Sequence, residues 1–222
     1  MPVMTDQPRQ RETRRRAQTR RRLIDAAREV FSEHSIRDTP VELICETAGF
    51  SRGAFYSNFD TKEDLFLAVY EEEMSLRIQK TRTIVNDVLV EGVADRESLH
   101  DAIVKVGTAC AESLIADHNW YMLVTEFRAH ALRDPQLRKR AGESLEHLTD
   151  SIAELLHEAL DRLNLRLAVD TRDAVRALTS VYEAQLEHAA FTGTSSSSKP
   201  LFTQIFPRMV QSFIEPGDLP ES

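Results

Sequence analysis

Residues 48–66 read AGFSRGAFYSNFDTKEDLF, and this stretch admits two incompatible interpretations. Gly49 to Gly53 spell G-x-S-x-G, the pattern of the nucleophile elbow of serine hydrolases, in which a strand delivers the serine to a strained turn. The same letters also suit the corner of a helix-turn-helix, in which two short helices meet and the second one enters a DNA groove. The neighbouring sequence decides between these interpretations.

The segments upstream of the corner have the pattern of helices. An apolar stripe predicts a first helix that runs to about Ser35, with members Leu23, Ala26, Ala27, Val30 and Phe31. Thr39-Pro40-Val41-Glu42 reads as a capping box with proline at the first helical position, and it predicts a short second helix. Gly49 is expected to end that helix with a positive φ.

The corner itself therefore favours DNA over catalysis. A capped helix, rather than a strand, precedes Ser51, and no strand pattern alternates with the helices to build the parallel sheet that an elbow requires. Ser51 is instead expected to cap a third short helix that ends near Asn58. Thr61 is expected to cap a long fourth helix. A serine hydrolase that uses Ser51 remains the enzymatic alternative.

Composition indicates an all-α protein. Only 7 of 222 residues are Gly and 8 are Pro, while 29% are charged and 41% are hydrophobic, as in long amphipathic helices with few tight turns. Five more helices are predicted at 96–117, 119–132, 135–164, 171–191 and 200–214.

Charge is divided unevenly along the chain. The net charge is −8, yet residues 1–22 hold eight Arg and two acidic residues, and residues 1–62 hold twelve basic and nine acidic residues. Such a chain is expected to bind a polyanion through its N-terminal end only. A second alternative function follows from the same observation: a helical adaptor whose arginine-rich arm binds RNA or an acidic protein.

Other classes of protein find little support in the sequence. Cys45 and Cys110 form no disulfide framework, and no apolar run of membrane-spanning length or export signal is present. We therefore expect a cytoplasmic protein without a membrane partner. No H-x-x-x-H or similar cluster indicates a metal, and we expect no cofactor.

Polar side chains of the corner have the chemistry of DNA contacts. Arg52 can donate two hydrogen bonds to guanine O6 and N7, and Tyr56 can meet a phosphate or a thymine methyl group. Lys62, with the N–H groups that open the fourth helix, is expected to hold a phosphate, and the arginine arm is expected to add phosphate or minor-groove contacts. Phe55 and Phe59 are expected to pack the small core. The residues expected at the DNA are Ser51, Arg52, Gly53, Tyr56, Asn58, Lys62, Arg20 and Arg21.

Residues 16–72 resemble the DNA-binding module of the tetracycline-repressor (TetR) family. The resemblance lies in the first-helix stripe and in Ile44, Ala48 to Gly53, Phe55-Tyr56, Phe59 and Lys62 to Leu65. It implies about nine helices: three for DNA, a fourth that links, and five that form a ligand-binding and dimerisation body. The implied division of the chain is a disordered basic arm at 1–15, the DNA-binding domain at 16–62, the larger domain at 63–216 and a disordered tail at 217–222.

The resemblance also implies a function other than catalysis. Such a protein is a ligand-responsive homodimeric regulator, here expected to be a repressor, that binds a palindromic operator and is released by a small-molecule inducer. The residues expected to contact the inducer are Tyr70, Met74, Cys110, Trp120, Tyr121, Glu126, Phe127, His130 and Tyr182. Core packing is the alternative role for each of them. The two last helices suit a four-helix dimer interface with Val175, Leu178, Tyr182, Leu201, Ile205 and Met209.

Three positions depart from the family's pattern. Pro40 stands where members often have Thr or Ser, Glu42 where they often have a basic residue, and Asp60 where many have Lys. The expected phosphate contacts of the second helix are thus missing or reversed in sign, and the arginine arm is the feature that can compensate for them.

Overall fold

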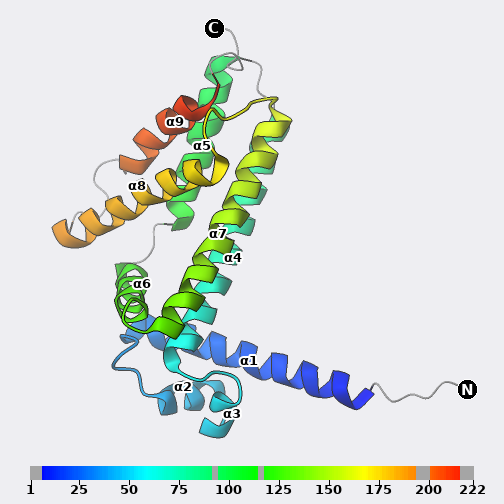
Figure 1. Cartoon of the computed structure of the whole chain (residues 1–222), viewed down its shortest axis with the longest axis vertical. Coiled ribbons are helices and arrows are strands. Elements are labelled where there is room, and N and C mark those ends of the chain that lie inside the picture. The colour runs from blue at the N-terminus through cyan, green and yellow to red at the C-terminus, as the bar shows by residue number, and fades with distance from the viewer. Residues whose placement is uncertain (1–6, 92–94, 115–117, 194–200, 216–222) are drawn as a thin grey trace, which may run out of the picture. The chain divides into compact units, whose positions relative to one another are not determined.

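The computed structural model describes residues 7–91, 95–114, 118–193 and 201–215, and these ranges are mostly helical (Figure 1). Their nine helices are α1 Gln7–Glu33, α2 Val41–Ala48, α3 Arg52–Tyr56, α4 Lys62–Glu91, α5 Arg96–Leu114, α6 His118–Ala131, α7 Pro135–Arg162, α8 Thr171–Thr192 and α9 Leu201–Phe213. An isolated antiparallel bridge joins Leu167 to Ile214. The all-α prediction is confirmed, and the helix bounds lie within a few residues of the predicted ones.

The N-terminal end differs from the prediction. Helix α1 begins at Gln7, so residues 7–15, which were expected to belong to a disordered arm, form its first turns. The physical reason is local: Arg, Gln and Glu are good helix formers, and Pro8 lies in the first turn, where its missing N–H costs nothing. Residues 1–6 and the predicted tail at 217–222 lie outside the described residues.

Of the capping box predicted at Thr39 and the cap predicted at Thr61, only the second forms. At the start of α4, Asp64 N–H donates to Thr61 Oγ1 at 3.0 Å and Thr61 N–H donates to the Asp64 carboxylate at 3.2 Å. At the start of α2 the prediction is wrong, because Pro40 is the N-cap and makes no side-chain cap bond. The buried Thr39 hydroxyl instead donates to Ser35 O at 2.7 Å, which fixes the connection between α1 and α2.

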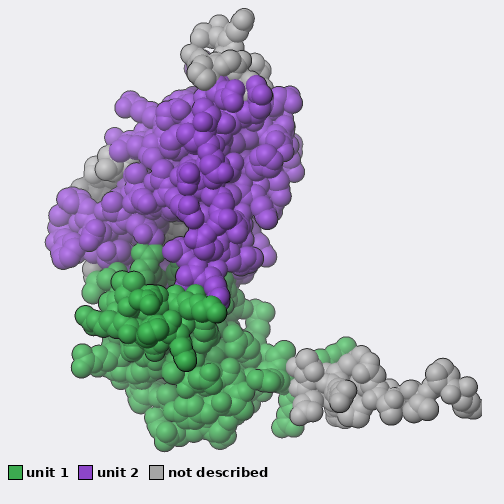
Figure 2. Space-filling view, viewed as in Figure 1, with its two compact units in different colours: residues 1–73, 122–141 green, residues 74–121, 142–222 purple. Residues whose placement is uncertain are grey.

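The described chain forms two compact units, coloured separately in Figure 2. Unit 1 comprises residues 1–73 and 122–141, and unit 2 comprises residues 74–121 and 142–222. Unit 1 is thus larger than the predicted DNA-binding domain, which was expected to end at residue 62. Aromatic packing explains the difference: the Phe66 ring of α4 lies 5.7 Å from the Phe31 ring of α1 and 5.2 Å from the Phe127 ring of α6.

The core of unit 1 is built from the predicted apolar stripe of α1, from the short helices α2 and α3 and from the first turns of α4. The side chains from these elements that are almost fully buried include Leu23, Ala27, Phe31, Ile44, Phe55, Leu65 and Phe66. Helix α2 packs against α1, so α1 supports the corner. This support fixes the position from which α3 presents its outer face.

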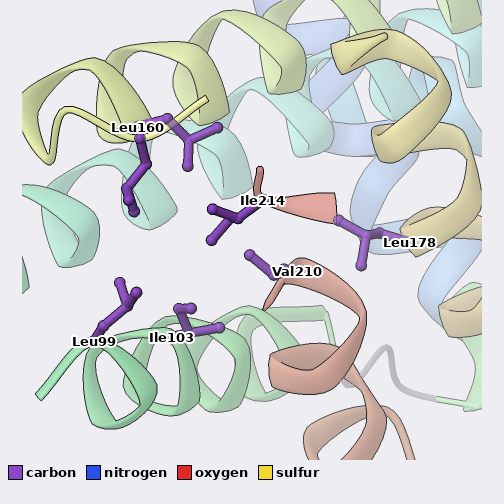
Figure 3. Close-up of a cluster of buried hydrophobic side chains, with 7 residues drawn as sticks. Leu99, Ile103, Leu160, Leu178, Val210 and Ile214 are labelled. Atoms are coloured by element: carbon purple, nitrogen blue, oxygen red, sulfur yellow. The ribbon is translucent and has the colours of Figure 1, made fainter. Parts of the chain in front are cut away.

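Unit 2 has its own apolar core, drawn in Figure 3. Side chains from α5, α7, α8 and α9, and from the residues that follow α7 and α9, converge there: Leu99, Ile103, Leu160, Leu165, Leu178, Val210 and Ile214. Helices α5 and α9 lie side by side (Figure 1), and Gly107 gives Phe206 the space it occupies, because a Cβ at that glycine would lie 2.3 Å from the ring. None of the helices in the described ranges combines the length and apolarity needed to cross a membrane.

Candidate DNA-binding surface

A three-residue connection joins α2 to α3. Gly49 has φ 69° and ψ 38°, a left-handed conformation that costs little only for glycine, as predicted. The N–H groups of Gly49 and Phe50 donate to Glu46 O and Cys45 O, which satisfies the last carbonyls of α2. Burial raises the pKa of the Cys45 thiol, which lies in this packed corner.

Ser51 is a helix cap, as predicted. Its Oγ accepts a hydrogen bond from Ala54 N–H at 3.3 Å at the start of α3. Helix α2, not a strand, leads into it, so the geometry of a nucleophile elbow is not built here. The hydroxyl is therefore used to hold the short helix in place.

Helix α3 has one buried side and one exposed side. Phe55 is fully buried, with its ring 6.0 Å from that of Phe59 and 5.1 Å from that of Tyr56, which confirms the predicted packing role of both phenylalanines. Tyr56 nevertheless leaves 49% of its surface exposed. Arg52 and Gly53 are exposed on the same short helix. The buried face of α3 thus fixes the helix, and its opposite face presents polar groups to solvent.

Arg52 has two neighbours that orient it. Its Nη1 lies 2.8 Å from Glu42 Oε1 of α2, and its guanidinium carbon lies 5.9 Å from the centre of the Tyr56 ring. Hydrogen bonding to Tyr56, followed by the negative charge of Glu42, raises the pKa of the Arg52 guanidinium. These two neighbours therefore hold the charged guanidinium of Arg52 in place at the start of α3.

An arginine of α1 closes the end of α2. Arg22 donates from Nη2 to Ala48 O at 2.8 Å, and its guanidinium lies 4.7 Å from the centre of the Phe50 ring. A Cβ at Gly49 would lie 3.2 Å from the same Nη2, so the glycine also makes room for this contact. A cation at C-terminal carbonyls stabilises a helix end.

Two further arginines of α1 reach the end of α3. Arg16 donates from Nη2 to Ser57 O at 3.2 Å, and Arg20 donates from Nη1 to Asn58 O at 3.4 Å. The Arg20 guanidinium also lies 4.3 Å above the centre of the Phe59 ring. Helix α1 therefore clamps both short helices through their carbonyl ends.

Sequence reasoning treated α1 arginines as DNA contacts and missed these clamps. Arg20 has the partners just described, and Arg21 lies 3.5 Å from Glu72. The signal that was overlooked is spacing: Arg16 and Arg20 extend the buried stripe of Leu23 and Ala27 by two further turns of the same face.

Two other predicted DNA residues also have partners within the chain. Lys62 Nζ donates to Arg37 O at 2.5 Å and to Thr39 O at 2.9 Å, and so fastens the connection between α1 and α2. Asn58 Nδ2 donates to Ala54 O at 2.8 Å. Both side chains are half-buried, so any contact with DNA is additional to a structural role.

Four candidate ligand contacts lie in unit 1, and the three that belong to α6 hold this helix to the head. The Glu126 carboxylate accepts from Ile36 N–H at 3.0 Å and from Arg37 N–H at 2.7 Å. His130 Nδ1 lies 3.6 Å from Glu63 Oε1. Phe127 is buried against Phe66, as described above, and Tyr70 of α4 also belongs to unit 1.

The start of α7 belongs to the same head. Arg140 forms an ion pair with the buried Asp64, which also caps α4. Asp134 accepts from the N–H groups of Leu137 and Gln136, and these bonds lower the pKa of its carboxyl group. An open surface depression at this turn is lined by His130, Arg133, Asp134, Pro135 and Gln136.

The other candidate ligand contacts belong to unit 2. The Arg77 guanidinium lies 5.6 Å from the centre of the Trp120 ring, and the Tyr182 ring lies 5.5 Å from that of Phe202. Met74 and Tyr121 are half-buried. The side chain of Cys110 lies outside the described residues. No cluster of three or more His, Cys, Asp or Glu suited to a metal ion occurs in the part of the chain that the structure describes.

Two of the predicted dimer contacts are buried within the single chain. Val175 is 1% exposed and Leu178 is 8% exposed within the single chain, because both side chains of α8 face their own unit. Met209 packs against the same core. Ile205 and Tyr182 are half-buried, and the Leu201 side chain is outside the described residues. The exposed Phe191 at the end of α8, 84% accessible, was not among the predicted residues.

The arrangement of α1, α2 and α3 defines a helix-turn-helix DNA-binding head, and known proteins place it in a family. Residues 23–69 match the family model described as bacterial regulatory proteins, tetR family. The helix-turn-helix head of the chain is thus similar to that of TetR-family transcriptional regulators. Its fold is also similar to the crystal structure of a protein assigned as a TetR-family regulator from Mesorhizobium loti, with a TM-score of 0.65, 24% identity and coverage of 90% of this chain and 96% of that one.

Curated relatives are similar at the level of the regulator class. The HTH-type transcriptional regulator UidR of Escherichia coli K12 is 28% identical over an alignment of 130 residues, with coverage of 53% of this chain and 66% of UidR. The HTH-type transcriptional repressor AcnR of Corynebacterium diphtheriae is 28% identical over 137 residues, which are 62% of this chain and 63% of AcnR. The chain thus spans just under two thirds of the length of both relatives.

Proposed function

We propose that the protein is a homodimeric transcriptional repressor that acts in the cytoplasm, binds a palindromic operator through α3 and is released by a small-molecule inducer. The observation that carries the proposal is the two-sided α3, in which a buried Phe55 fixes the helix and exposed Arg52 and Tyr56 occupy its outer side. Side chains near the N-terminus of a recognition helix are the ones that meet base edges.

At the operator, Arg52 reads a guanine through O6 and N7, and Tyr56 meets a phosphate or a thymine methyl group. Gly53 leaves room for close approach, and Ser51 and Asn58 add short-range donors. Lys62, Arg20 and Arg21 add phosphate contacts with N–H donors that their intrachain partners do not use, since an ammonium group has three and a guanidinium five.

Repression is supported by the relative AcnR, whose name describes a repressor. A palindromic operator fits two copies related by a two-fold axis.

For the dimer interface we propose the sides of α8 and α9 that carry Phe191, Tyr182 and Ile205. Light scattering should give a mass about twice that of one chain. Phe191→Glu should lower it, whereas Leu132→Glu, at an exposed leucine of unit 1, should leave it unchanged.

Release by an inducer rests on continuity of sequence, because α4 begins at Lys62 in unit 1 and reaches Met74 in unit 2. A small molecule that contacts Met74, Trp120, Tyr121 or Tyr182 in unit 2 biases α4 and so the head. A coupling of about 1–3 kcal/mol is typical of such regulation. Coupling is reciprocal, so a compound found to bind must prefer the free protein to the operator complex. Equal affinity for both would rule out this mechanism.

The proposed function is tested by selecting duplexes from a random library with the wild-type protein. Recovery of a palindrome is expected, and Arg52→Ala should weaken binding to it by about 1–3 kcal/mol and blunt selection at one base pair of each half-site. Binding of single-stranded RNA or acidic protein with no preference for a palindrome would instead support an adaptor that uses its arginine-rich N-terminus. Labelling of Ser51 by an active-site-directed phosphonate would support a hydrolase.

A further inference from the structure

The ion pair between Glu42 and Arg52 spans the corner of the helix-turn-helix. Glu42 lies in the first turn of α2 and Arg52 is the first residue of α3, and their charged atoms are 2.8 Å apart. Both side chains remain well exposed, at 50% and 61%. Solvent screens such a pair, so it contributes little to the stability of the fold. Its effect is on where the guanidinium points.

The geometry of the pair leaves Arg52 able to read a base. Glu42 Oε1 lies 2.8 Å from Nη1 and Tyr56 is a further hydrogen-bond partner, but a guanidinium offers five N–H donors, so donors remain for two bonds to guanine. The Tyr56 ring lies near the same guanidinium, 5.9 Å away. Held between α2 and the ring, Arg52 loses less side-chain freedom when it binds a base, because much of that freedom is already lost.

The same pair works against binding to phosphates. Random-sequence DNA is held by Lys and Arg that swing to phosphate oxygens, and it offers no matched base edge. A carboxylate next to Arg52 cancels part of its charge and restrains that movement. The carboxylate therefore weakens non-specific binding more than operator binding.

We propose that Glu42 is a specificity-determining residue, which positions Arg52 for a base edge and withholds it from phosphates. The inference rests on the proposed function, since it requires that α3 read DNA. It gives a physical role to a negative charge that faces a polyanion, at a position where a charge of the opposite sign would increase affinity.

The variants that test this role are Glu42→Gln, Arg52→Ala and the double variant, with Glu46→Gln as the matched control. Glu46 is exposed one turn further along α2, so its variant removes the same charge from the same helix. All are measured against the duplex that the wild-type protein selects from a random library and against a scrambled duplex, across a salt series. Circular dichroism checks that each variant is folded.

Glu42→Gln is expected to raise affinity for the scrambled duplex about fivefold and for the selected duplex about twofold at most, so the specificity ratio falls. The salt slope on the scrambled duplex should steepen, by about one unit per subunit, as Arg52 gains a phosphate. In the Arg52→Ala background the same change should leave the ratio unaltered. Glu46→Gln should raise both affinities alike.

Two results would overturn the inference. One is a Glu42→Gln variant that behaves as Glu46→Gln does, which would reduce Glu42 to a general negative charge. The other is a loss of specificity that persists without Arg52, which would mean that Glu42 contacts a base itself. If the wild-type protein selects no duplex, the proposed function and the inference are both refuted. If the wild-type protein selects a duplex and Glu42→Gln has the same specificity ratio as the wild type, the inference alone is refuted.

Discussion

Each of the two compact units has an apolar core, and a different kind of contact stands out within each. In unit 1, charged side chains fasten backbone groups of distant segments, as Glu126 does at Ile36 and Arg37 and as Arg22 does at Ala48. In unit 2, the described core is apolar, and a glycine of α5 accommodates a phenylalanine ring of α9. Unit 1 thus adds side-chain bonds to backbone groups to its own apolar core, while a close steric fit stands out in the core of unit 2, and the expected consequences of substitution at these sites differ.

The largest expected effect tests shape in unit 2. Gly107→Ala should destabilise the protein by about 3 kcal/mol, because the new Cβ would lie 2.3 Å from the stiff Phe206 ring and overpacking is costly. Gly142→Ala on α7 is the control: no atom lies within 4 Å of its added Cβ, and alanine should stabilise that helix by about 0.5–1 kcal/mol. Urea unfolding measures both. Equal shifts for the two variants would contradict the packing argument.

This contrast explains what could be predicted from the sequence. Periodicity identified the apolar stripes, and glycine and capping chemistry identified the corner, because these signals are local. Which side of a stripe faces which neighbour is not local: Val175 and Leu178 carry a pattern that suits an interface or a core equally well, and the fold uses them in the core. The Gly107 site was equally hidden, since it depends on a ring ninety-nine positions away.

Polar clamps were the least predictable feature. Glu126 and Lys62 were assigned to ligand and phosphate because both carry charges in suggestive places. Their observed acceptors and donors are backbone groups of residues 36 to 39, which no side-chain pattern reveals. When a charged side chain bonds to a backbone carbonyl or N–H group, the residue type of the partner is not constrained. The sequence therefore carries no signal of the contact.

The second prediction concerns such a clamp. Glu126→Ala should destabilise the protein by about 2 kcal/mol, because two backbone N–H groups lose a charged acceptor. Glu126→Gln should fall between this variant and the wild type, since it retains one oxygen. Glu29→Ala, at an exposed position of α1, serves as the control and should change stability little. Thermal unfolding separates them, and a neutral Glu126→Ala would show that the clamp carries no weight.

Lys62 allows its two proposed roles to be separated. Lys62→Ala should lower stability by about 1.5 kcal/mol, through loss of its bonds to Arg37 O and Thr39 O. It should also reduce the salt slope of DNA binding, by about one unit per subunit, if the remaining N–H donor meets a phosphate. Denaturant unfolding and a salt titration report these effects independently. A reduced stability with an unchanged slope would assign Lys62 to the fold alone.

The smallest effect is expected at Ser51, the serine of the G-x-S-x-G pattern that could be interpreted in two ways. Ser51→Ala removes the Oγ that accepts from Ala54 N–H and should cost about 1 kcal/mol of stability, as is usual for a lost N-cap. Ser51→Asp should restore most of it, because a carboxylate can also cap and suits a helix N-terminus. Selection of the operator duplex should persist in Ser51→Ala, since Arg52 carries the base contact in the proposed function. The measurements are thermal unfolding and duplex selection. Stability that is the same in all three proteins would show that the hydroxyl does not hold α3, and loss of selection in a normally stable Ser51→Ala variant would move the base contact from Arg52 to Ser51.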